Sequence, residues 1–143
     1  MVWQVPFRDD SLAPGTVCFL LEPAIAEMAA LHAEKTDIRK ISALCDEVEA
    51  LLLCGEDHTG KDIEFHTAIA MSSKNLVVPR LIPVINSSIP LFIQLTNNRL
   101  LHETIETHRE ITDAIAAHDT LRAKDAMYLH LVYNRRCLLD QKA

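Results

Sequence analysis

Apolar residues recur three and four positions apart along most of the chain, the spacing at which side chains share one face of an α-helix. Capping residues, glycines and prolines divide this pattern into six segments. The predicted helices span residues 17–35, 36–55, 60–73, 75–99, 100–118 and 119–140. The fourth segment contains Pro79, Pro83 and Pro90, so we expect a kinked or interrupted helix there. The pattern predicts an all-α fold.

Local signals mark the ends of several predicted helices. The second helix is expected to begin at Thr36 or Asp37, both good N-caps, and to end at Gly55. The last two helices are expected to be joined by a tight turn over residues 118–120, which would make them antiparallel neighbours.

The composition agrees with a single helical domain. A chain of 143 residues with 49% hydrophobic residues is long enough to bury one full core. Three glycines and 5% aromatic residues favour helices over sheet. Residues 1–16 contain two prolines and no helical period, so we expect an N-terminal arm or linker there and an all-helical domain over residues 17–143.

Charge and cysteine usage exclude several classes of partner. The net charge of −6 leaves no excess of basic residues to neutralise a phosphate backbone, so we expect no direct DNA binding by this chain. The four cysteines form no CxxC pair, and no signal peptide or apolar run of membrane length precedes them. We expect a cytoplasmic protein with free thiols and no membrane partner.

Four side chains that can bind a metal fall on faces predicted to be buried. Asp62 and His66 are four residues apart and share the apolar face of the third helix. His108 lies on the apolar face of the fifth helix, and His130 on that of the sixth. Each lies eleven residues from Asp119, so an antiparallel hairpin brings both to the same height, roughly 16 Å from the turn. One carboxylate and three imidazoles then converge, as in metal sites inside helix bundles.

Two interpretations of these histidines remain open. Each could be a core imidazole hydrogen-bonded to a neighbouring group, but burying three without a cation would be costly. The remaining histidines have no comparable arrangement and are expected on the surface or in loops: His32, His58, His102 and His118. His118 and Asp119 form the "HD" dipeptide of helical metal-dependent phosphohydrolases, at a turn rather than within a helix, which keeps a hydrolase as an alternative. A metal-free helical dimerisation module is the second alternative.

Two stretches carry a family resemblance: "DIEFHTAIAMSSKNLVVPRL" at residues 62–81 and "THREITDAIAAHDTLRAKDAMYLHL" at 107–131. Together with "LLEPAIAEMAALHAEK" at 20–35, they resemble the C-terminal effector-binding (FCD) domain of FadR-type GntR transcription regulators. The resemblance implies an antiparallel bundle of six or seven helices around a central metal and ligand cavity, in a dimeric regulator that is not an enzyme. It also implies one divalent transition metal (zinc, nickel or manganese) and a small organic acid effector. The implied metal ligands are Asp62, His66, His108 and His130.

The effector-binding residues are harder to assign. Family members commonly carry an arginine at the position of Cys18, which leaves Arg80 or Arg99 as alternative cations. Asn134 lies four residues after His130 on the same helical face, and Asn86 is a polar break in an apolar run. The family's winged helix-turn-helix has no counterpart here, so we expect an expressed domain, a truncated product or a stand-alone sensor.

The charge balance gives a first prediction. At micromolar protein concentration, the chain is expected to cause no salt-sensitive mobility shift of a DNA duplex, because it lacks both a recognition helix and excess positive charge. An electrophoretic shift assay at low and high salt tests this. Sequence-specific binding would contradict the expectation that DNA contacts belong to another domain.

Overall fold

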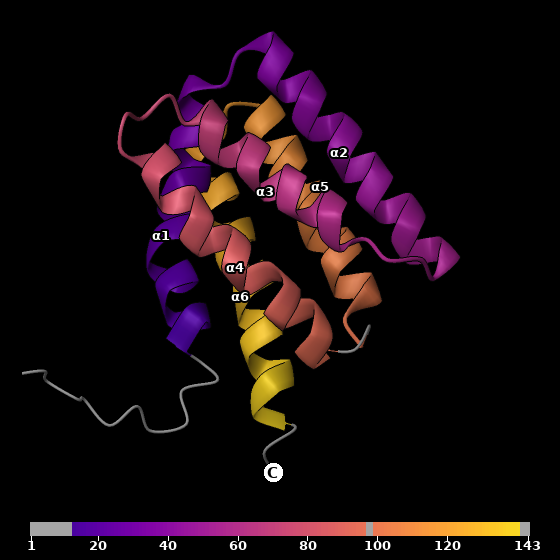
Figure 1. The fold of residues 1–143 in the computed structure, drawn as a ribbon. Helices are drawn as coiled ribbons and strands as arrows, with labels where there is room; N and C mark the ends of the chain where they lie inside the picture. Colours follow the sequence, from indigo (N-terminus) through magenta and orange to yellow (C-terminus); the bar gives the residue numbers. More distant parts are fainter. Residues whose placement is uncertain (1–12, 97–98, 141–143) are drawn as a thin grey trace, which may run out of the picture.

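The structure is a computed structural model that describes residues 13–96 and 99–140. Within these residues it is all-α, with six helices and no strand (Figure 1). The helices are α1 (Ala13–His32), α2 (Lys35–Cys54), α3 (Thr59–Ser72), α4 (Val78–Thr96), α5 (Leu101–Ala116) and α6 (Thr120–Asp140). Helix α1 begins four residues before the predicted start at residue 17. The rest of the expected arm, residues 1–12, lies outside the described residues.

Helix α4 differs from the prediction most clearly. It runs from Val78 to Thr96 as one continuous helix, although it contains Pro83 and Pro90. Of the two expected alternatives, a kinked or an interrupted helix, the interruption is therefore wrong. Pro79 is in the first turn, where no intrahelical N–H is needed, and all three proline side chains are exposed. The missing amide donors therefore lie on the solvent side, where water can bind the freed carbonyl groups.

The ends of α2 show which capping signals were correct. Its N-cap is Glu34, whose backbone N–H donates to Asp37 Oδ2 at 2.9 Å, so the predicted start at Thr36 or Asp37 was wrong by two or three residues. The carboxylate of Asp37 acts from the third helical position, as in a capping box. The predicted end is confirmed: Gly55 adopts a left-handed conformation with φ 70°. Its N–H donates to Leu52 O at 3.2 Å.

The turn between α5 and α6 was predicted correctly. Helix α5 ends at Ala116 and α6 begins at Thr120. His118 has a positive φ of 55°, and its Nδ1–H donates to Ala30 O of α1 at 2.8 Å. Asp119 Oδ1 accepts from the Arg122 backbone N–H at 3.0 Å and so caps α6. This short connection makes α5 and α6 the antiparallel pair that carries two of the site histidines.

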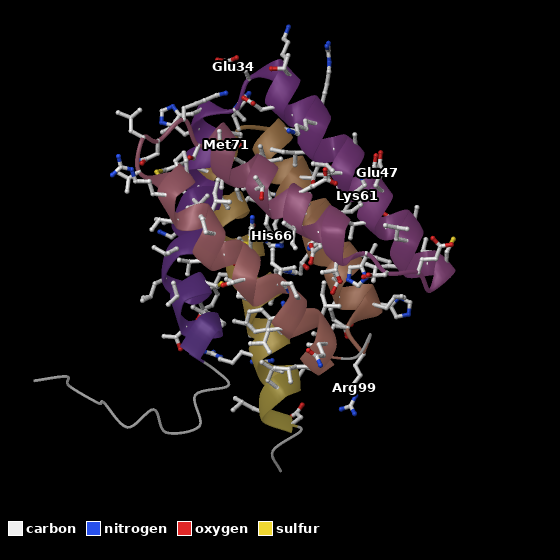
Figure 2. The ribbon with its side chains drawn as sticks, in the orientation of Figure 1. Glu34, Glu47, Lys61, His66, Met71 and Arg99 are labelled. Carbon is white, nitrogen blue, oxygen red and sulfur yellow. The ribbon has the colours of Figure 1, made fainter. Side chains whose placement is uncertain are left out.

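The six helices enclose one core. Helix α6 packs against α1, α5 and α4, while α2 covers α3 and α5 at the edge of the bundle (Figure 1). Among the largest fully buried side chains are Phe65, Ile41, Ile69, Ile85, Ile111 and Ile115. Each such side chain contributes roughly 1.5–3 kcal/mol by leaving water. Exposed ion pairs, such as Lys61 with Glu47 at 2.8 Å (Figure 2), contribute little, because water and salt screen them. Apolar burial therefore holds the helices together.

Helix α4 is also unusually apolar for its position. In the described part of the chain it is the one helix long and apolar enough to cross a membrane, and 22% of its apolar window is buried. This corrects the expectation that the chain has no apolar run of that length. One such helix is weak evidence for a membrane span, because helices of water-soluble domains reach the same composition. Through Ile85, Ser88 and Ile89, α4 packs onto the bundle.

The end of α2 provides a test of the fold. Gly55→Ala is expected to lower the free energy of unfolding by about 1 kcal/mol, because a Cβ disfavours the left-handed φ of 70°. Gly60→Ala is the matched control, since Gly60 lies in the first turn of α3 and both added Cβ atoms meet open space. Urea unfolding of the two variants measures the difference. Equal stability would mean that α2 does not end in this conformation.

Candidate functional site

Two of the predicted metal-binding side chains come from α3. Asp62 and His66 lie one helical turn apart, and their side chains are 8% and 3% exposed. Asp62 is in the first turn, where the helix dipole favours a negative charge. Its Oδ1 lies 3.5 Å from His66 Nε2. The i, i+4 spacing therefore places a carboxylate and an imidazole together inside the bundle.

The other two side chains come from the α5–α6 hairpin. The ring centroids of His108 and His130 are 4.7 Å apart, so the equal distance from Asp119 predicted their proximity correctly. His66 lies 5.7 Å from His108 and 5.5 Å from His130, again between ring centroids. One nitrogen from each of the three histidines lies within 4.8 Å of the other two. This buried cluster could hold a metal ion.

Outer hydrogen bonds orient two of the three rings. His66 Nδ1 donates to Glu22 Oε1 at 2.6 Å, because a carboxylate can only accept. The Thr107 hydroxyl donates to Glu103 O at 2.7 Å, so it accepts from His130 Nδ1 at 2.9 Å. Both rings therefore carry a proton on Nδ1, and Nε2 is the nitrogen left for a metal ion. Metal-binding histidines are typically oriented in this way by a carboxylate or another acceptor.

Three buried atoms of the cluster have no hydrogen-bond partners among the described residues. These atoms are Asp62 Oδ1 and both ring nitrogens of His108. His108 Nε2 is 3.4 Å from Asp62 Oδ1, an ion-pair distance without hydrogen-bond geometry. Unpaired buried polar atoms are costly, and three nitrogens with one oxygen suit a divalent transition metal. The residues present therefore fit such an ion.

The electrostatics of the cluster favour an added cation. Burial and the charge of His66 lower the pKa of His130 to about 4, and burial lowers the pKa of His108 well below its usual value. Burial opposes protonation of His66 as well, but Glu22 and Asp62 raise its pKa to about 10. Burial opposes ionisation of Asp62, yet the nearby imidazoles lower its pKa. Two carboxylates thus face one imidazolium, a net negative charge that a divalent cation in place of the His66 Nε2 proton would neutralise.

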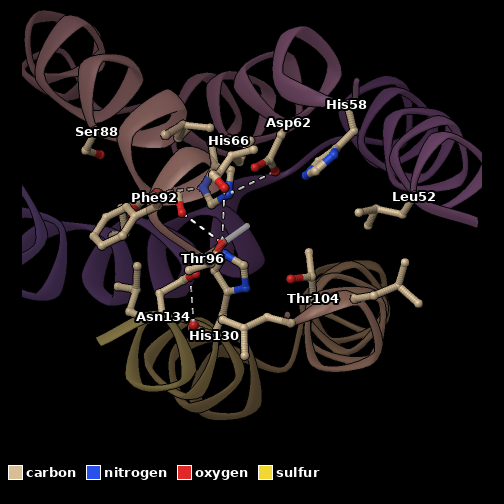
Figure 3. Close-up of a pocket in the computed structure, with 16 residues that line it drawn as sticks. Leu52, His58, Asp62, His66, Ser88, Phe92, Thr96, Thr104, His130 and Asn134 are labelled. Carbon is tan, nitrogen blue, oxygen red and sulfur yellow. Dashed lines mark hydrogen bonds and ion pairs between the residues drawn. The ribbon is translucent and has the colours of Figure 1, made fainter. Parts of the chain in front are cut away.

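A cavity adjoins the cluster (Figure 3). Its space for water molecules is about 40 Å³, room for roughly three waters, so an organic ligand must displace water and move side chains. No lysine or arginine is among its described lining residues. These are Glu22, Leu52, His58, Asp62, His66, Ser88, Ile89, Phe92, Ile93, Thr96, Leu100, Leu101, Thr104, His130, Leu131 and Asn134.

The structure separates the proposed effector-binding residues. Asn134 lines the cavity, and its Nδ2 donates to His130 O at 3.2 Å. Arg80 and Asn86 do not line it: Arg80 is exposed, and Asn86 accepts a hydrogen bond from Thr67 at 3.2 Å. Arg99 is exposed as well, at the lower end of the bundle in Figure 2. None of the three predicted alternatives therefore reaches the cavity.

The position of the expected arginine is occupied by a neutral side chain. Cys18 is fully buried, and its Sγ lies 2.9 Å from Ser88 Oγ. Burial and the charge of Glu22 raise the pKa of the Cys18 thiol to about 12. The thiol therefore stays protonated at neutral pH and supplies no charge to the cavity, either positive or negative.

The remaining histidines divide into two groups. His32, His102 and His118 are exposed, as expected. His58 was predicted on the surface or in a loop, but it is only 6% exposed and lines the cavity. The sequence analysis also missed Glu22 and Thr107 as partners of the site histidines. The spacing of four residues between His58 and Asp62 was a usable signal for His58, whereas nothing in the local sequence connects Glu22 to His66.

The "HD" dipeptide is not part of this site. His118 and Asp119 form the turn between α5 and α6, where they bind Ala30 and cap α6. Both side chains are exposed and neither lines the cavity. The four predicted metal-binding side chains lie close together. A metal-free dimerisation module would be expected to leave them scattered.

Comparisons with known proteins identify the family of this chain. The model of the FCD domain family matches residues 16–133. The chain is 34% identical over 119 residues to the Uxu operon regulator of Haemophilus influenzae, covering 78% of this chain and 45% of that protein. It is 32% identical over 131 residues to the Uxu operon transcriptional regulator of Escherichia coli, covering 85% and 51%. The Escherichia coli galactonate operon transcriptional repressor is 29% identical over 124 residues, covering 85% and 54%.

A solved structure supports the same assignment. Streptococcus agalactiae GntR matches with a TM-score of 0.76 and 32% sequence identity, over 91% of this chain and 62% of that one. The chain spans about half the length of the curated relatives described above. The matched residues include all six helices except the first residues of α1 and the end of α6. The chain belongs to the FCD domain family, the effector-binding domain of GntR-type transcription regulators, and is a regulatory domain rather than an enzyme.

Proposed function

We propose that this chain is a metal-dependent sensor domain in which one divalent transition metal anchors a small organic acid. The metal ligands would be Asp62, His66, His108 and His130. The observation that carries the proposal is the convergence of three buried histidine nitrogens beside Asp62, with the outer nitrogens of His66 and His130 already bonded. In a metal-free core, these outer hydrogen bonds would still leave the inner atoms of the cluster without partners. Around a metal ion, the same bonds orient the rings so that their inner nitrogens bind the ion.

The metal would supply open coordination positions as well as charge. Four protein ligands leave one or two positions for water or a ligand oxygen on an ion that accepts five or six ligands. Zinc, nickel and manganese all accept a set of three nitrogens and one oxygen. A carboxylate or hydroxyl of the effector would take these positions from the cavity side, where Asp62, His66 and His130 all contribute to the lining.

The proposed effector is a hydroxylated monocarboxylic acid. One relative is a galactonate operon repressor, and galactonate is a compound of this kind. The absence of lysine and arginine from the described cavity lining disfavours a second carboxylate. Asn134 would orient the effector, because its Oδ1 remains available when Nδ2 is bonded to His130 O. Arg80 and Asn86 are not part of this proposal, since they do not reach the cavity.

The partners of the whole regulator are also proposals. We propose that two copies form a homodimer and that DNA is bound by another domain of the regulator in the cytoplasm, as the family membership suggests. Helix α4 has an exposed apolar surface that includes Val84. Light scattering of the purified chain tests the dimer directly.

Metal binding is the first prediction from this proposal. Purified protein is expected to hold about one equivalent of a divalent transition metal, and His108→Ala or His130→Ala to lose it. His102→Ala is the control, because His102 is exposed and outside the cluster. A metal at a hundredfold excess over its Kd should stabilise the fold by about 2.7 kcal/mol. Elemental analysis without metal, together with no stabilisation by any added metal, would remove the proposal.

Effector binding is the second prediction from the proposed function. In a thermal-shift screen, hydroxy acids are expected to stabilise the metal-loaded chain and to have no effect after chelation, because they bind through the metal. Asn134→Ala should reduce the stabilisation while leaving the metal content unchanged, since Asn134 is not a ligand in the proposal. Acids that stabilise the chelated chain equally would show that the anchor lies elsewhere.

A further inference from the structure

His58 is the one cavity-lining histidine that belongs to no metal-binding cluster in the described part of the chain. It precedes α3, and its side chain points into the cavity beside Asp62 (Figure 3). The residue is 6% exposed, so its imidazole is almost entirely removed from water. An imidazole in this position requires an explanation, because buried polar groups normally have a partner.

The fold itself does not supply that explanation. His58 occupies the N-cap position of α3, yet its side chain makes no capping hydrogen bond. Its backbone carbonyl accepts from the Asp62 N–H at 2.9 Å, a contact that any residue could make. Among the described residues, the His58 ring has no hydrogen-bond or ion-pair partner. The His58 ring nitrogens are not among the fully buried unpaired atoms of the described residues, so they remain accessible from the cavity that His58 lines.

The other polar groups of the cavity are nearly all engaged. Ser88 Oγ donates to Ile85 O at 2.7 Å, and Thr96 Oγ1 donates to Phe92 O at 2.8 Å. Asn134 is bonded to the His130 carbonyl. Apart from the cluster atoms, the lining side chains left without a hydrogen bond in the described structure are His58 and Thr104. These two come from different parts of the chain, His58 from the segment before α3 and Thr104 from α5 (Figure 3).

We propose that His58 is the recognition residue for the effector atoms that lie away from the metal. This rests on the proposed function, in which the metal binds one end of the acid. The His58 ring would hydrogen-bond a distal hydroxyl group, and the Thr104 hydroxyl would contact the same part of the ligand. His58 thus takes the recognition role that Cys18 cannot perform, since the Cys18 thiol is neutral and bonded to Ser88.

This role sets the chemical class of the ligand. An imidazole ring can take part in hydrogen bonds with a hydroxyl group, which both donates and accepts. An arginine in that place would instead favour a second carboxylate. The cavity also contains Glu22 and Asp62, which repel additional negative charge. The domain should therefore prefer acids with one carboxylate and hydroxyl groups beyond the metal-binding end.

Calorimetric titration of the full chain, loaded with zinc, tests the proposal with two probes. D-gluconate has one carboxylate and several distal hydroxyls, whereas glycolate has only the end that binds metal. His58→Leu is expected to weaken gluconate binding roughly tenfold, the effect of one lost hydrogen bond, and to leave glycolate binding and zinc content unchanged. His58→Gln retains a donor and should lose less. His32→Leu, at the exposed end of α1, is the control.

The results of the titrations distinguish a failure of the role proposed for His58 from a failure of the proposed function. Equal gluconate affinity in wild type and His58→Leu would overturn the role of His58 and leave the metal-anchored sensor intact. An equal loss for both acids, or loss of zinc in both His58 variants, would show that His58 acts on the metal site and not on the distal hydroxyls. If the zinc-loaded wild type binds neither acid, the proposed function fails, and the recognition role falls with it.

Discussion

The burial of one carboxylate and three imidazoles at the centre of the bundle is the constraint on which this structure depends. Asp62, His66, His108 and His130 are each at most 6% exposed, and they come from three different helices. Such groups cannot be buried unpaired without a cost of a few kcal/mol each. The helices near them place hydrogen-bond acceptors at Nδ1 of His66 and of His130, and they bring one nitrogen of each imidazole close to the other two.

The surrounding core makes this arrangement rigid. Phe65 is fully buried and stacks on His108 with ring centroids 4.5 Å apart, so an apolar ring packs directly against the cluster. Glu22 of α1 is hydrogen-bonded to His66, and Thr107 of α5, the residue before His108, is hydrogen-bonded to His130. The site therefore joins α1, α3, α5 and α6. A ligand that contacts the cluster would act on four helices at once, which is what an effector domain needs in order to transmit binding.

Sequence reasoning predicted the parts of the site that depend on helical period. Asp62 with His66 follows from an i, i+4 spacing, and His108 with His130 follows from equal distances to a turn. Contacts between distant segments, such as Glu22 with His66, could not be found in this way because they depend on how α1 crosses α3. Arg80 was proposed from its charge alone. It is exposed at the start of α4, because the charge of a residue does not determine which way its side chain points. The prediction of an interruption in α4 failed for a related reason. Whether a proline interrupts a helix depends on which side of the helix faces water, and the sequence alone does not show this.

X-ray absorption spectroscopy of the metal-loaded chain tests the central claim most directly, because it identifies the atoms bound to the ion. With zinc, the account predicts a shell of nitrogen and oxygen atoms at about 2.0–2.1 Å, with the outer-shell scattering of about three imidazoles. It predicts no sulfur, although the chain has four cysteines, all of them free thiols. A shell that contains sulfur at about 2.3 Å, or one of oxygen atoms alone, would contradict it.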